Sequence, residues 1–88
     1  MNPYILNGSR MLTRADAHDE IAQALAFPAY YGRNLDALWD MIYPMEADVT
    51  LVNASAMLEA LGDYGKNLLE TLLEANEKTR SFRFRIEE

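Results

Sequence analysis

Residues 65–87 read G-K-N-L-L-E-T-L-L-E-A-N-E-K-T-R-S-F-R-F-R-I-E, and the spacing of their apolar residues changes partway along. Up to Lys78 the leucines recur three and four residues apart, which is typical of one face of an α-helix. From Phe82 onward apolar and charged residues alternate, which is typical of a strand with one buried face. This stretch therefore predicts a helix that leads into a strand of a half-buried sheet.

The predicted helix over about residues 65–78 has separate apolar and acidic faces. Successive residues of a helix lie 100° apart, so the leucines fall on one side and the glutamates on the other. The leucines expected in the core are Leu68, Leu69, Leu72 and Leu73, and the outward glutamates are Glu70, Glu74 and Glu77. In the strand, the expected core residues are Phe82, Phe84 and Ile86.

Outward from this stretch, the sequence predicts two further strands and three further helices. The strands cover residues 4–6 and 48–52, and the helices cover about 14–26, 35–42 and 56–61. The expected helix caps are Thr13, Asn34 and Ser55, and the expected stops are Pro28, Pro44 and Gly62. The order strand, helix, helix, strand, helix, helix, strand predicts an α/β fold with a small, three-stranded parallel sheet packed against about four helices.

Length and composition limit the class of protein. Eighty-eight residues make one domain, which we expect to span residues 1–88. There is no cysteine, which excludes disulfides and thiol catalysis and fits a reducing compartment. No apolar run is long enough to span a membrane, and the amino terminus lacks the pattern of a secretory signal. We therefore expect a cytoplasmic protein that is not bound to a membrane.

The net charge of −6 is concentrated in the middle of the chain. Residues 34–77 hold nine acidic side chains against one lysine, whereas residues 1–33 are balanced and residues 78–88 are slightly basic. An acidic segment of this kind argues against nucleic acid as a direct ligand, because binding to phosphates needs positive charge. It favours a basic partner, a cation or simple solubility.

Residues 30–40, Y-Y-G-R-N-L-D-A-L-W-D, combine acidic and aromatic side chains on a short helix and the loop before it. Helical spacing places Leu35, Leu38 and Ile42 on one stripe, which we expect to face the core. It places Asp36 and Asp40 on the far side, with Trp39 at the border between the two faces. Like charges four residues apart repel, by about 0.2–0.5 kcal/mol on an exposed helix. Such a pair beside tryptophan and two tyrosines is typical of a surface that binds another protein. We expect one of the two tyrosines to pack inward.

Other roles for the two aspartates stay open, although the residues favour them less. Catalysis by paired carboxylates needs two different environments, whereas Asp36 and Asp40 share one helix face. A divalent metal ion needs more ligands than this pair offers, so a metal-assisted hydrolase is a weak hypothesis. His18, the one histidine, lies on the apolar edge of its helix and is expected to be a packing residue. No glycine pattern indicates a nucleotide or other cofactor. We expect no enzyme activity, no cofactor and no metal.

Residues 30–40 closely resemble the most characteristic segment of the barstar family of ribonuclease inhibitors, with one difference. Looser resemblance extends over the whole chain, including residues 5–8, 25–28 and 73–75. The resemblance implies the family's fold, a three-stranded parallel sheet packed against helices. It implies that the second helix and the loop before it plug the active site of a basic, barnase-like ribonuclease in a 1:1 complex. It also implies that the inhibitor is monomeric when free.

The resemblance also implies a contact surface on this chain. Its members are Tyr30, Tyr31, Gly32, Asn34, Asp36, Trp39, Asp40 and Glu74. By the same resemblance, Asp40 takes the position of a phosphate among the enzyme's basic residues, Asp36 pairs with neighbouring basic groups, and Tyr30 stacks near the catalytic histidine. The protein would then act as the immunity protein, or antitoxin, for a secreted or toxin ribonuclease.

Three positions depart from the family pattern. Arg33 stands where barstar has an acidic residue, the connection at Tyr43-Pro44-Met45 is shorter, and Thr71 replaces an apolar residue. These changes leave open a second hypothesis, in which the same surface serves as an immunity or regulatory module for a different basic toxin or partner protein that is not a ribonuclease.

Overall fold

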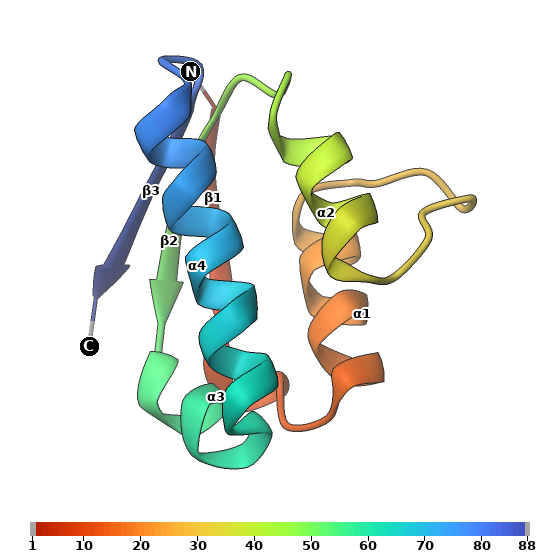
Figure 1. Ribbon diagram of the computed structural model, residues 1–88, viewed down its shortest axis with the longest axis vertical. Helices are drawn as coiled ribbons and strands as arrows, with labels where there is room; N and C mark the ends of the chain where they lie inside the picture. The colour runs from red at the N-terminus through yellow and green to blue at the C-terminus, as the bar shows by residue number, and fades with distance from the viewer. Residues whose placement is uncertain (1, 88) are drawn as a thin grey trace.

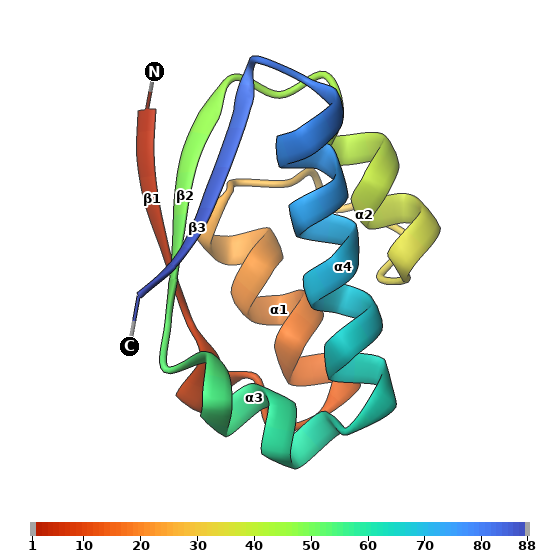
Figure 2. The ribbon, with the colours of Figure 1, turned by 60° about the vertical axis from the view of Figure 1, so that its left-hand side comes forward.

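The computed structural model describes residues 2–87 as a parallel sheet with helices on one side of it (Figures 1 and 2). The elements in chain order are β1 Asn2–Asn7, the 3-10 turn η1 Gly8–Arg10, α1 Arg14–Ala24, α2 Leu35–Ile42, β2 Ala47–Val52, α3 Ala54–Leu61, α4 Asp63–Lys78 and β3 Phe82–Glu87. The predicted fold class, an α/β fold with a three-stranded parallel sheet and four helices, is confirmed. The predicted domain ends, residues 1 and 88, lie outside the described residues.

The sheet has the order β1-β2-β3, with β2 paired in parallel to a neighbour on each side. Leu51 of β2 stands opposite Leu6 of β1, and Val49 of β2 stands opposite Phe84 of β3, so buried residues of neighbouring strands share rows. Parallel neighbours need long crossover connections, and the helices supply them. In Figure 2, α1 and α4 lie beside the sheet and α2 lies further out, which leaves α2 with a broad outward side.

The core lies between the inner face of the sheet and the helices. Its fully buried large side chains include Leu6, Val49, Leu51 and Phe82 from the strands and Ile21, Leu38, Ile42, Met57, Leu68 and Leu72 from the helices. The leucines predicted from the helical spacing at residues 68 and 72 are therefore in the core, as are the phenylalanines predicted from the alternation in β3.

Several details of the prediction are wrong at the ends of elements. The helix α1 stops at Ala24 because Ala26 adopts a left-handed backbone conformation with φ +57°. The helix α3 begins at Ala54, directly after Asn53 in the left-handed region, so Ser55 lies inside the first turn and is not the cap. Leu73 was expected in the core but is 41% exposed, since it points about 100° away from the buried Leu72. Ile86 was also expected in the core but is 42% exposed, because it lies near the end of β3, an edge strand of the sheet.

Candidate functional site

The helix α2 is oriented by its first residue and by two apolar side chains. The backbone N–H of Ala37 donates a hydrogen bond of 2.7 Å to the side-chain oxygen of Asn34, so the predicted cap is confirmed. Leu38 and Ile42 are fully buried, which fixes the rotation of the helix about its axis. Asp36 and Asp40 consequently lie in solvent, and we call this pair the acidic face of α2.

The two neighbouring tyrosines have opposite surroundings. Tyr30 is 84% exposed, whereas Tyr31 is 6% exposed and packs edge-on against Phe27, with ring centroids 4.9 Å apart. The expectation that one tyrosine packs inward is confirmed. Tyr31 therefore anchors the segment between α1 and α2 to the core, and Tyr30 is left standing out from the surface.

A hollow of about 200 Å³ joins this segment to the acidic face of α2. Its lining residues are Tyr30, Tyr31, Gly32, Ala37, Asp40 and Met41. It brings together four residues of the predicted contact surface, from the loop and from α2. Two other predicted members do not line this hollow. Trp39 is half-buried against Tyr43, with ring centroids 5.1 Å apart, and Glu74 is exposed on α4, where it forms an ion pair of 2.8 Å with Lys78.

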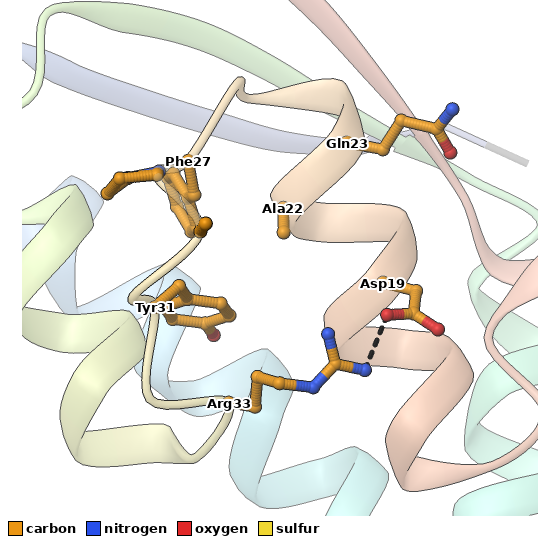
Figure 3. Close-up of a pocket in the computed structure, with 8 residues that line it drawn as sticks. Asp19, Ala22, Gln23, Phe27, Tyr31 and Arg33 are labelled. Atoms are coloured by element: carbon orange, nitrogen blue, oxygen red, sulfur yellow. Dashed lines mark ion pairs between the residues drawn. The ribbon is translucent and has the colours of Figure 1, made fainter.

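Arg33, the one basic residue in the segment, is turned onto α1. Its Nη2 atom forms an ion pair with the carboxylate of Asp19 (Figure 3). The same atom donates a hydrogen bond of 3.2 Å to the backbone oxygen of Ala15. Both partners belong to α1. The positive charge is therefore matched within the protein, in a way that the sequence around residue 33 does not reveal.

His18 is buried between two tyrosines. It is 1% exposed, and its Nδ1 and Nε2 atoms lie 2.7 Å from the hydroxyl oxygens of Tyr31 and Tyr64 respectively. The buried hydroxyl of Tyr31 needs an acceptor, so we assign its O–H as donor to Nδ1 and the Nε2–H as donor to Tyr64. The expected packing role is confirmed, but the hydrogen bonds could not be predicted, because residues 18, 31 and 64 come from three different segments.

This environment favours the neutral ring. Burial lowers the pKa of His18 below its usual value of about 6.5; the charge of Arg33 lowers it further, and that of Asp19 opposes the shift. Burial likewise raises the pKa of Tyr31, so its hydroxyl stays protonated. Protonation of His18 would also turn Nδ1 into a donor and leave the Tyr31 hydroxyl hydrogen without its acceptor.

We expect the free energy of unfolding to fall as the pH drops from 7 to 5. In this window the unfolded chain takes up a proton on histidine near pH 6.5, whereas the native ring, whose pKa is lowered, resists protonation. His18 contributes at most about 1.4 kcal/mol per pH unit to the slope of the free energy of unfolding against pH. Urea unfolding at several pH values should show a smaller slope for His18→Gln, which keeps a donor and an acceptor. An unchanged slope in that variant would contradict the assignment.

The described residues offer little for other kinds of site. Among residues 2–87, no three histidine, aspartate or glutamate side chains gather closely enough to hold a metal ion. Within the same residues, no helix is long and apolar enough to cross a membrane.

Fold and site together define a small α/β protein with a parallel three-stranded sheet and an exposed acidic helix next to an aromatic loop. The chain matches the family model described as Barstar (barnase inhibitor) over residues 1–87, and it belongs to that family. It is also similar to a protein of Bacillus subtilis (strain 168) named "Putative ribonuclease inhibitor YrdF". The two are 37% identical over an alignment of 83 residues, and the match covers 91% of each chain.

Proposed function

We propose that this protein inhibits a barnase-type ribonuclease by inserting the acidic face of α2, with the loop before it, into the basic active site of the enzyme. The observation that carries the proposal is the exposure of Asp36 and Asp40 next to Tyr30, which is 84% exposed. Membership in a family described as barnase inhibitors and the similarity to a relative named as a ribonuclease inhibitor support the same activity.

The chemistry of the two partners accounts for the inhibition. A ribonuclease binds the phosphates of RNA with arginine, lysine and histidine side chains, and carboxylates carry the same sign of charge as those phosphates. Side chains four residues apart on a helix stand about 5–6 Å apart, so Asp36 and Asp40 present two negative charges in a fixed arrangement. Their mutual repulsion is relieved when basic groups of the enzyme surround them. No bond is formed or broken, so the protein acts as an inhibitor and not as an enzyme.

The proposed contact surface contains exposed and supporting members. Tyr30, Gly32, Asn34, Asp36, Asp40 and Glu74 are exposed, and Trp39 is half-buried. Tyr31 is buried, and its part is to hold the loop that carries Tyr30 and to form the wall of the hollow beside Asp40. We propose that one inhibitor, monomeric when free, binds one enzyme, and that it protects the cytoplasm of the cell that makes the ribonuclease.

A second candidate is an immunity or regulatory module for a basic partner that is not a ribonuclease. The observation behind it is the change at Arg33, whose charge lies at the edge of the same surface. Both candidates require a basic partner and the same acidic face. They differ in one readout, because only the first predicts that binding stops RNA cleavage.

We expect association with the ribonuclease to slow steeply as salt is added. Opposite charges on the two proteins steer their encounter, and the Debye length falls from about 30 Å at 0.01 M to about 3 Å at 1 M ionic strength. Stopped-flow fluorescence over this range should show a drop in the association rate constant of at least about tenfold. The dissociation rate should change much less. An association rate that does not depend on salt would contradict the electrostatic part of the proposal.

A further inference from the structure

The loop between α1 and α2, residues 26–33, is built on an unfavourable backbone. We call it the contact loop. Ala26 at its start has φ +57° and Arg33 at its end has φ +58°, and neither residue is a glycine. Residues with a Cβ atom rarely adopt this left-handed conformation unless the surrounding structure holds them there. The shape of the contact loop must therefore be held by contacts of its side chains and backbone.

The middle of the contact loop stands away from α1. A hollow of about 480 Å³ lies between them, with Ala22 and Gln23 of α1 on one side and Phe27 and Tyr31 of the loop on the other (Figure 3). Close packing therefore does not seat the whole loop on the helix, although the hydroxyl of the buried Tyr31 reaches His18 of α1 at 2.7 Å. The start of the loop is fixed by a backbone hydrogen bond of 2.9 Å from the Phe27 N–H to the Ala22 oxygen.

Beyond the buried anchor at Tyr31, the end of the contact loop is fixed by the side chain of Arg33. Its guanidinium reaches across the edge of the hollow to α1, where it pairs with Asp19 and donates to the backbone oxygen of Ala15 (Figure 3). The next residue, Asn34, caps α2. The position of Arg33 thus sets where the contact loop ends and where α2, with its acidic face, begins.

We infer that Arg33 is a positioning residue, whose ion pair with Asp19 holds the contact loop in the shape that presents Tyr30 and Gly32 to the partner. The consequence for binding rests on the function proposed above, whereas the effect on the loop does not. Arg33 is then not a contact for the basic enzyme. Its charge is matched by Asp19, which keeps a cation from opposing the acidic face of α2.

Electrostatic steering and loop positioning predict opposite results when Arg33 is removed. The protein has a net charge of −6 and is proposed to bind a basic enzyme, so the loss of any exposed positive charge should speed association. If Arg33 positions the loop, its loss should instead weaken binding, because the loop must be ordered during association. Lys66 on α4 is an exposed basic residue remote from the contact loop in sequence and serves as the matched control.

The first test needs no partner and follows amide hydrogen exchange by NMR. The Tyr31 N–H donates a hydrogen bond of 3.0 Å to the Pro28 oxygen within the loop, so its protection reports on the loop's shape. We expect its exchange to become about fivefold faster in Arg33→Ala and in Asp19→Ala, since an exposed ion pair is a weak restraint. The double variant should exchange no faster than either single one, and Lys66→Ala should match the unaltered protein. Unchanged exchange in Arg33→Ala would overturn the inference, whatever the partner is.

The second test measures binding of a barnase-type ribonuclease to the same variants. We expect the dissociation constant to rise several-fold in Arg33→Ala and to fall slightly in Lys66→Ala, although both lose one positive charge. Equal falls in both variants would show that Arg33 acts only through its charge and would overturn the positioning role. Failure of every variant and of the unaltered protein to bind would count against the proposed function, while the exchange experiment would still decide the inference.

Discussion

Replacement of Asp40 by alanine should weaken binding to a barnase-type ribonuclease by more than about thirtyfold and leave the fold intact. Asp40 is exposed on α2 and lines the hollow beside Tyr30, so the partner can surround it with basic groups. A central, charged hot-spot residue contributes about 2 kcal/mol or more, and barstar itself is among the systems in which such residues were measured. In the free protein, the change removes repulsion with Asp36 and leaves no cavity.

The measurement is a dissociation constant for Asp40→Ala by surface plasmon resonance, together with a thermal melt. Glu59→Ala is the matched control, because it removes one exposed carboxylate from α3, at the end of the molecule away from α2 (Figure 1). The control should bind nearly as well as the unaltered protein. Similar losses of affinity in both variants would show that binding depends on the net charge of the protein and not on the acidic face of α2. A melt showing that Asp40→Ala is unfolded would contradict the outward placement of the residue.

Replacement of Leu38 by alanine should have the opposite effects to Asp40→Ala: a large loss in the free energy of unfolding, with binding by the folded protein retained. Leu38 is fully buried where α2 meets the core, and truncation of such a leucine costs about 2–5 kcal/mol through lost burial and the cavity left behind. Domains of this size are stable by only about 5–15 kcal/mol, so the loss should be plain in urea unfolding. The molecules that remain folded keep both aspartates and should still bind the partner.

Leu73→Ala is the matched control for Leu38→Ala. Leu73 is the same kind of residue on the neighbouring helix α4, but it is 41% exposed. Its truncation should cost less than about 1 kcal/mol, because surface changes of this kind are usually small. Equal losses from the two truncations would contradict the arrangement of α2 and α4 described above.

The orientation of α2 could be predicted from the sequence because local rules determine it. Asn34 is a strong cap, and the spacing of Leu38 and Ile42 selects the buried side of a short helix, which places Asp36 and Asp40 on the opposite side. The strand β3 could be predicted for the same reason, from the alternation of its residues.

The features that could not be predicted depend on contacts between distant segments. The pairing of Arg33 with Asp19 occurs together with a left-handed backbone at Arg33, and no sequence signal marks that conformation at a residue that is not glycine. The hydrogen bonds of His18 need Tyr31 and Tyr64 to meet it from two other segments. Leu73 follows the leucine pattern of α4, but it is 41% exposed, because the neighbouring elements cover the side of α4 that carries Leu68 and Leu72.

The most direct test of the central claim is a titration of this protein into a barnase-type ribonuclease at a fixed concentration, followed by RNA cleavage. We expect cleavage to fall linearly to zero near one equivalent, and Asp40→Ala at the same ratio to leave most of the activity. Full cleavage at several equivalents of folded protein would contradict the proposed inhibition of a barnase-type ribonuclease.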